Sequence, residues 1–211
     1  MKKKETFIAK YQEFELLHGR SPHSVVEFCK AYKSTEEEFY KHFSGLTQLR
    51  KEILLSIINE TIIILDADDN YESYSGREQA LAFFFTLVEE LKSHRSYLQA
   101  KYATIHSVKE GWKDWEMFFR QFDARMEQVV LAAKQSDEIA ERPIVGAYYA
   151  KSFRLTFTYI FRVWINDESN NFETTDAAIE KSVNLAFELL GKGALDSIVD
   201  FGRFALKTKW M

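Results

Sequence analysis

Residues 33–50 read KSTEEEFYKHFSGLTQLR, and this stretch contains two helix starts separated by a Ser-Gly break. Thr35 is followed three residues later by Glu38, which is the spacing of a capping box. In such a box the Thr hydroxyl accepts a hydrogen bond at the helix start, and the Glu side chain turns back toward the same end. The pattern predicts a short helix that ends near His42. After the break, a longer helix is expected to begin near Leu46.

The residues before this stretch predict two further helices. Apolar side chains at helical spacing indicate the first one: Phe7, Ile8, Tyr11, Phe14 and Leu17. Gly19 is expected to end it, because glycine readily adopts the left-handed conformation that closes many helices. Ser24 has a side chain that suits a helix N-cap, so a second, short helix is expected to follow it. Cys29 would lie on the apolar face of that helix, which predicts a buried thiol rather than a reactive one.

The rest of the chain is also expected to be helical. The helix that begins at Leu46 should reach about residue 66, where the polar run DADD is interpreted as a solvated helix end. Further helices are expected at about 77–93, 95–107, 112–135, 143–166, 175–190 and 194–208. The chain has only two prolines and eight glycines, whereas sheet proteins need frequent turn residues. The predicted fold class is therefore all-α.

Composition and charge point to a folded protein with a mild charge asymmetry. Hydrophobic residues make up 46% of the chain, which is too apolar for a disordered protein. Residues 1–50 contain nine Lys/Arg and seven Asp/Glu, although the whole chain has a formal charge of −4. A weakly basic N-terminal segment on an acidic body suits a small DNA-binding head. The start MKKKETF lacks the apolar core of a signal peptide, so we expect a cytoplasmic protein.

The sequence offers little support for catalysis. The five histidines have no metal-ligand spacing, and the single cysteine has no Cys/His motif around it. We therefore expect a protein that is not an enzyme and has no cofactor and no metal.

Three short helices followed by a long one, with FYKHFSGLTQL at the junction, resemble the TetR family of bacterial one-component repressors. In that family a helix-turn-helix head reads DNA, and a larger helical body binds a small molecule and dimerises. The resemblance covers about residues 5–55, and beyond them only the number and lengths of the helices agree. It implies a head at 1–48 and a ligand-binding and dimerisation body at 49–211. It also implies operator DNA, a small ligand and a second copy of the chain as partners.

The resemblance assigns ten residues to the DNA-binding region: Ser24, Lys33, Ser34, Thr35, Glu36, Glu37, Phe39, Tyr40, Lys41 and His42. Among them, Tyr40, Lys41 and His42 match positions that touch phosphates in the family. The match implies that the helix ending near His42 enters the major groove of a near-palindromic operator.

The sequence departs from the family pattern at several of these positions. Lys33 stands where the tight turn usually has glycine, and Leu46 replaces a lysine that meets the DNA backbone. Glu36 and Glu37 replace small or basic residues on the exposed recognition face. Carboxylates repel phosphate, and their direct base partner is the cytosine amino group. We therefore expect weak DNA binding with a strong dependence on salt.

The body contains aromatic clusters that could line a pocket for a small, mostly apolar ligand. The candidate contacts are Phe84, Phe85, Trp115, Phe118, Phe119, Phe122, Tyr149, Phe153 and Phe157. The alternative is that these rings are ordinary core or dimer interface. The helices expected at 143–166 and 175–190 are too apolar for the surface of a monomer, which predicts a homodimer formed largely by them.

A second resemblance leaves another function open. The segment RVWINDESNNFETTDAAIEKSVNLAFELL, followed by the apolar ALDSIVDFGRFALK, is similar to lipid-binding ubiquinone-biosynthesis proteins built on the TetR scaffold. Those proteins have lost DNA binding and hold an isoprenoid or lipid in the body. The alternative to a regulator is therefore a TetR-fold protein that binds a lipid or a hydrophobic metabolite.

Overall fold

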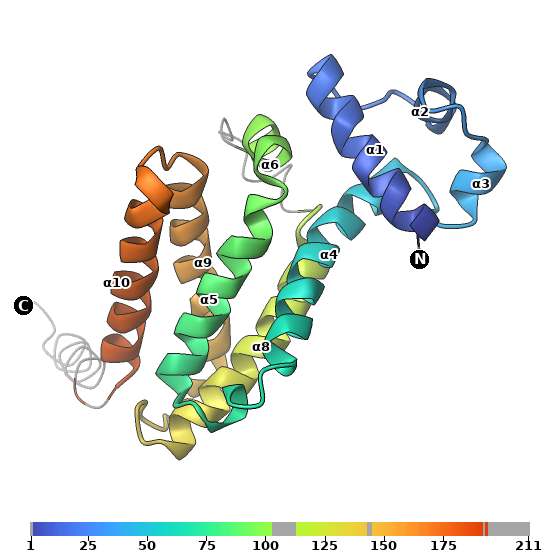
Figure 1. The fold of residues 1–211 in the computed structure, drawn as a ribbon. Helices are drawn as coiled ribbons and strands as arrows, with labels where there is room; N and C mark the ends of the chain where they lie inside the picture. Colours follow the sequence, from blue (N-terminus) through green and yellow to red (C-terminus); the bar gives the residue numbers. More distant parts are fainter. Residues whose placement is uncertain (1, 103–112, 143–144, 192, 194–211) are drawn as a thin grey trace, which may run out of the picture. The chain divides into compact units, whose positions relative to one another are not determined.

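The computed structural model describes residues 2–102, 113–142, 145–191 and 193, and all regular elements in these residues are helices (Figure 1). This confirms the all-α class that the scarcity of proline and glycine predicts. The last expected helix, at about 194–208, lies outside the described residues.

The helix bounds agree closely with the periodicity of the sequence. The α-helices are α1 Lys2–His18, α2 Val25–Ala31, α3 Glu36–Tyr40, α4 Leu46–Asp66, α5 Gly76–Lys92, α6 Arg95–Tyr102, α8 Glu116–Gln135, α9 Tyr149–Ile165 and α10 Glu173–Leu190. Short 3₁₀ turns are η1 Tyr71–Ser73, η2 Val145–Tyr148 and η3 Asn170–Phe172. The helix expected to end near His42 ends at Tyr40, because the His42 N–H bonds to the Phe39 carbonyl in a tighter turn.

The described residues form two compact units. Unit 1 takes its residues from 1–63 and 87–122, and unit 2 takes its residues from 64–86 and 123–211. The helices α4, α5 and α8 each contribute residues to both units. The expected division into a head at 1–48 and a body at 49–211 stays a prediction.

Within unit 1, the helices α1, α2 and α3 enclose an aromatic core. Phe28 and Phe39 are fully buried, and Phe7 packs edge-on against Phe39 with ring centroids 5.6 Å apart. Phe43 completes the group at 5.4 Å from Phe39. Cys29 lies beside these rings and is 2% exposed, which confirms the expected buried thiol, and burial raises its pKa.

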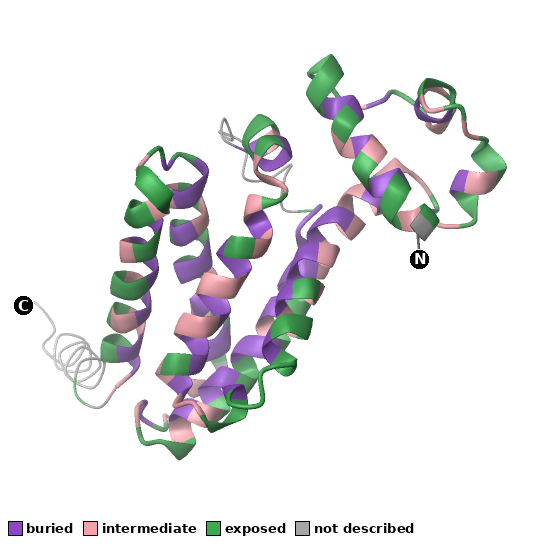
Figure 2. Ribbon diagram, in the orientation of Figure 1, coloured by how far each residue is buried: buried purple, intermediate pink, exposed green. Residues whose placement is uncertain are grey.

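Within unit 2, α9 and α10 pack along their lengths, and each buries a stripe of apolar side chains. Phe153 of α9 meets Phe187 of α10 with ring centroids 5.9 Å apart, and both side chains are buried. Figure 2 shows the buried positions of α10 on one side of the helix and the exposed positions on the other. Further buried members of the two stripes are Tyr149, Phe157, Ile160, Trp164, Ile179 and Val183.

One buried carboxylate, that of Asp167, accepts the hydrogen bonds that hold the connection between α9 and α10 in place. Asp167 accepts hydrogen bonds from the backbone N–H and hydroxyl of Ser169, at 2.8 and 2.6 Å. It also accepts from the N–H and hydroxyl of Thr175 in the first turn of α10, at 2.8 and 2.5 Å. Burial alone would raise the pKa of Asp167, but these four donors outweigh it and hold the pKa at about 2.

We predict that Asp167→Asn lowers the free energy of unfolding at pH 7 by about 1–3 kcal/mol, because an amide nitrogen cannot accept the bonds that one carboxylate oxygen accepts. The folded pKa of about 2 lies below the ordinary value of 3.8, so the carboxylate stabilises the fold above pH 4. That contribution is lost as the pH falls through the folded pKa. Urea unfolding at several pH values should show the gap between wild type and variant closing toward about pH 2.

The control for this series is Asp176→Asn, which removes an exposed carboxylate from the first turn of the same helix. It should change stability by only about 0.3–1 kcal/mol. A gap between wild type and Asp167→Asn that stays constant from neutral to acid pH would contradict the assignment of the low pKa.

The first residue of α5 lies against α8 so closely that only glycine fits there. A Cβ built on Gly76 would lie 2.4 Å from the Cβ of Ala133 and 2.5 Å from its backbone N and Cα. A rigid helix backbone cannot move away as a flexible side chain does. The contact therefore fixes the distance between α5 and α8 within unit 2.

We predict that Gly76→Ala lowers the free energy of unfolding by about 1–3 kcal/mol, as overpacking does, despite the better helix propensity of alanine. Urea denaturation followed by circular dichroism measures this. Gly45→Ala is the matched control. Gly45 directly precedes α4, and a Cβ added to it meets nothing within 4 Å. Equal stability of the two variants would refute the close contact.

Candidate functional site

The segment from α2 to α3 has the local geometry of two capped helices joined by a tight turn. The Ser24 hydroxyl accepts a hydrogen bond from the Glu27 N–H at 3.1 Å, and the Thr35 hydroxyl accepts one from the Glu38 N–H at 3.2 Å. Both N-caps that the sequence predicts are therefore confirmed. Each cap satisfies a backbone donor that the first turn of a helix leaves without a partner.

The turn between these helices depends on a left-handed residue. Lys33 has φ of 52°, a conformation that favours glycine and that other residues adopt with about 1–2 kcal/mol of strain. Its N–H bonds to the Lys30 carbonyl at 3.3 Å, and the Ser34 N–H bonds to the Cys29 carbonyl at 2.9 Å. This confirms the expectation that Lys33 occupies a position where a glycine would be relaxed.

The ten residues assigned to DNA binding come together around α2, the turn and α3, but they differ in exposure. Phe39 is fully buried and packs against Phe7 and Phe28, so its contribution would be to the shape of the head rather than to contact with DNA. Ser34 and His42 are half-buried. The exposed members are Ser24, Lys33, Thr35, Glu36, Glu37, Tyr40 and Lys41.

Two of the three carboxylates of α3, Glu37 and Glu38, pair with lysines of unit 1. Lys3 donates to Glu38 at 2.6 Å, and this bond lowers the pKa of Glu38. Lys41 lies 3.2 Å from Glu37 and 3.8 Å from Glu38. The expectation that the Glu38 side chain turns back onto the helix start is therefore wrong, because α1 supplies a stronger, charged donor for it.

The nine aromatic residues proposed as ligand contacts are divided between the two units. Trp115, Phe118, Phe119 and Phe122 belong to unit 1, and the other five, Phe84, Phe85, Tyr149, Phe153 and Phe157, belong to unit 2. All are buried except Phe85, which is half-buried. In unit 1 they pack on one another, with Trp115 and Phe118 ring centroids 5.0 Å apart. Their role as ligand contacts stays a prediction.

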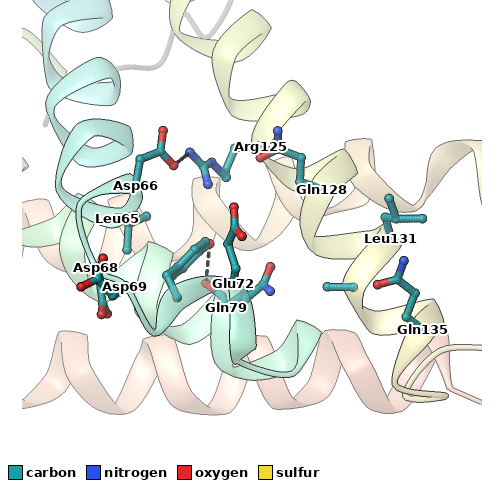
Figure 3. Close-up of a pocket in the computed structure, with 12 residues that line it drawn as sticks. Leu65, Asp66, Asp68, Asp69, Glu72, Gln79, Arg125, Gln128, Leu131 and Gln135 are labelled. Carbon is teal, nitrogen blue, oxygen red and sulfur yellow. Dashed lines mark hydrogen bonds and ion pairs between the residues drawn. The ribbon is translucent and has the colours of Figure 1, made fainter.

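A polar pocket lies elsewhere in unit 2, where the sequence reading missed it. Its volume is about 670 Å³, and residues from the end of α4, the turn that follows it, η1, α5 and α8 line it (Figure 3). None of the nine aromatic candidates is among its lining residues, which are Leu65, Asp66, Asp68, Asp69, Tyr71, Glu72, Gln79, Arg125, Gln128, Leu131, Ala132 and Gln135. The carboxylate run DADD was a visible signal, but its interpretation as a solvated helix end gave no reason to expect a pocket.

Sequence reasoning also missed a buried ionic cluster in unit 1. Glu15 of α1 accepts hydrogen bonds from Tyr11 at 2.6 Å and from Ser21 at 2.5 Å. Lys101 of α6 donates to both oxygens of the same carboxylate at 2.9 Å. Burial would raise the pKa of Glu15, but these donors together lower it. Glu15 and Lys101 are 86 residues apart, so no local pattern could indicate the pair.

Two further properties of the described residues bear on function. They contain no group of three or more His, Cys, Asp or Glu side chains that could hold a metal ion. None of the helices within them is long and apolar enough to cross a membrane.

No curated protein and no solved structure matches this chain. Residues 79–205 match the family model described as "Tetracyclin repressor-like, C-terminal domain". The match covers more than half of the 211 residues and includes most of unit 2. The chain therefore belongs to the family of tetracycline repressor-like (TetR) proteins.

Proposed function

We propose that the protein is a homodimeric, DNA-binding regulator of transcription whose body binds a small, mostly apolar ligand. Family membership supports a TetR-type body. The observation that carries the DNA-binding part is the turn at Lys33, with φ of 52°, between the capped helices α2 and α3. A helix-turn-helix needs such a turn, because it must set the second helix at a steep angle to the first.

In this proposal α3 enters the major groove, and the exposed Tyr40 and Lys41 at its end approach phosphates. Glu36 and Glu37 in its first turn face the groove or its edge. They can accept from cytosine amino groups, and elsewhere they repel the DNA backbone. The resulting affinity is low, and it falls steeply as the salt concentration rises.

A specific observation favours a second candidate function. Lys3 and Lys41 are cations that would attract phosphate, but each already lies beside a carboxylate of α3. A head whose cations are neutralised in this way suits a protein that has lost DNA binding. That candidate is a TetR-fold protein that carries a lipid or a hydrophobic metabolite.

The homodimer in the proposal uses α9 and α10. Leu155 is 75% exposed and Tyr159 is 54% exposed on α9, while Leu185 is 55% exposed on α10. Residues four positions apart lie on one face of a helix, and Leu189 extends the exposed face of α10. Large apolar side chains gathered on two neighbouring helices are typical of an interface between subunits.

We predict that the purified protein binds DNA from around its own gene weakly at low salt, and that Glu36→Gln combined with Glu37→Gln strengthens non-specific binding about threefold to tenfold. The reason is the removal of two charges that repel phosphate. Electrophoretic mobility shifts at two salt concentrations measure the effect. The variant should also discriminate less between its own operator and unrelated DNA, since Glu can read cytosine.

The control for the DNA experiment is Asp176→Asn combined with Glu180→Gln, which removes two exposed carboxylates from α10. It makes the same change in net charge outside the head and should leave DNA binding unchanged. If the wild type and the Glu36/Glu37 variant both fail to bind DNA at low salt, the regulator proposal fails. The lipid-carrier candidate then takes its place, with bound lipid detectable by mass spectrometry of organic extracts.

We predict that the wild type sediments as a dimer, at about twice the chain mass of 24.8 kDa, at micromolar concentration. Leu155→Asp combined with Leu185→Asp should weaken the dimer at least about a hundredfold, because two-fold symmetry places each change at the interface twice. Analytical ultracentrifugation measures both. Circular dichroism shows whether the variant keeps its helical content.

Leu17→Asp provides the matched control for the dimer. Leu17 on α1 is 71% exposed, nearly as much as Leu155, and it lies outside the proposed interface. The control should remain dimeric. A monomeric wild type, or a Leu155/Leu185 variant that dimerises as tightly as the control, would rule out this interface.

A further inference from the structure

Two ion pairs of unit 1 are connected by a buried tyrosine hydroxyl. Lys101 of α6 pairs with Glu15 of α1 at 2.9 Å, and Arg50 of α4 pairs with Asp114, in the turn before α8, at 3.1 Å. Both carboxylates belong to buried residues. The Tyr11 hydroxyl donates to Glu15 at 2.6 Å and accepts a hydrogen bond from Arg50. The two pairs therefore form one network that joins α1, α4, α6 and the turn before α8.

The charges of the two pairs act within one buried environment. Burial raises the pKa of the Tyr102 hydroxyl, and the carboxylates of both Asp114 and Glu15 raise it further. Tyr102 is therefore within electrostatic reach of both carboxylates. Charges interact strongly where burial excludes water, so the state of one pair affects the other.

Arg50 has more donors than its bond to Asp114 uses. Its Nε donates to Asp114 at 3.1 Å, whereas its Nη2 donates to the neutral hydroxyl of Thr47 at 3.2 Å. A guanidinium has five N–H donors in a planar fork and keeps its charge when its partners change. A hydrogen bond to a carboxylate is stronger than one to a hydroxyl. Thr47 is therefore a partner that Arg50 can exchange for a carboxylate.

The carboxylate within reach of such an exchange is Glu15. Arg50 and Glu15 already bond to the same hydroxyl, that of Tyr11. In the observed arrangement the Nζ of Lys101 lies 2.9 Å from both oxygens of Glu15, which neutralises that carboxylate. Arg50 then has no electrostatic reason to leave Asp114.

We propose that Arg50 is a second counter-ion for Glu15, and that the network exchanges partners when Lys101 moves away. Without Lys101, two buried carboxylates compete for one guanidinium. Arg50 then turns from Thr47 toward Glu15, and its hold on Asp114 weakens. The contact of α4 with the turn before α8 therefore depends on the position of α6, which makes the network a two-state ionic switch. The inference does not depend on DNA binding or on a ligand.

A double-mutant cycle of Lys101→Met and Asp114→Asn tests the exchange, with urea denaturation of the full-length protein as the measurement. Each single substitution should lower the unfolding midpoint, because each removes one partner of a buried ion pair. In the Lys101→Met background, Asp114→Asn should instead raise the midpoint, because it leaves Arg50 to Glu15 alone. The coupling should amount to at least about tenfold in the unfolding equilibrium constant. If Lys101→Met alone does not fold, folding of the double variant is the same rescue.

The matched control is Glu116→Gln in the Lys101→Met background. Glu116 is exposed and pairs with Lys51 of α4 at 2.6 Å, so the substitution makes the same change in net charge close to Asp114 but outside the network. It should not raise the midpoint. A crystal structure of the Lys101→Met/Asp114→Asn variant gives a direct second readout, and a guanidinium nitrogen of Arg50 should lie about 3 Å from a Glu15 oxygen.

Several outcomes would overturn the exchange of partners. The first is a lower midpoint on adding Asp114→Asn in both backgrounds, or a double variant that fails to fold. The second is equal rescue by Glu116→Gln, which would mean that only net charge matters. The third is a crystal structure of the double variant in which Arg50 stays away from Glu15.

Discussion

The carboxylate of Glu15 is the point on which the packing of unit 1 depends. A buried charge is tolerated only when it is fully paired, and here Tyr11, Ser21 and Lys101 all donate to it. The cluster joins α1 to Ser21, in the loop between α1 and α2, and to α6, which comes much later in the chain. Removing Lys101 would leave the carboxylate buried without a counter-charge of its own, and breaking such pairs typically costs about 3–5 kcal/mol. A second ion pair, between Arg50 of α4 and Asp114, acts alongside it at 3.1 Å in the same unit. Within unit 1, α1 is therefore tied to α6 by ionic contacts, and it is joined to α2 and α3 by the aromatic core.

Features that arise within a few residues could be read from the sequence. The left-handed turn at Lys33 was implied by the family resemblance, because glycine usually stands there, whereas the caps at Ser24 and Thr35 depend on local backbone geometry that their residue types favour. The same holds for the bounds of α4, where the apolar pattern begins after a Ser-Gly break and ends in a run of carboxylates. The fold class follows from such local signals because helices satisfy their backbone hydrogen bonds internally.

Features that join distant segments could not be read in this way. Glu38 was expected to complete a capping box, yet Lys3 lies 35 residues away and offers a full charge that a backbone N–H lacks. Arg125 and Asp66 are 59 residues apart, and their ion pair forms one side of a pocket that no sequence motif predicts. The aromatic candidates illustrate a different limit. Eight of the nine are buried and Phe85 is half-buried, but a ring that fills a core and a ring that lines a cavity have the same spacing in the sequence.

If the protein binds DNA as proposed, the three glutamates of α3 set the stability of that helix against its affinity for DNA. A helix of five residues has few internal hydrogen bonds, so it depends on its ends. Carboxylates in the first turn interact favourably with the positive end of the helix dipole. Glu38 adds a bond to Lys3 of α1, and Glu37 holds Lys41 at the other end of the helix. Each of these interactions orders α3, and each places negative charge on the surface that would face phosphate or neutralises a cation there. The charges that keep this short helix in place are therefore the same charges that, in the proposed function, would weaken its attraction to DNA.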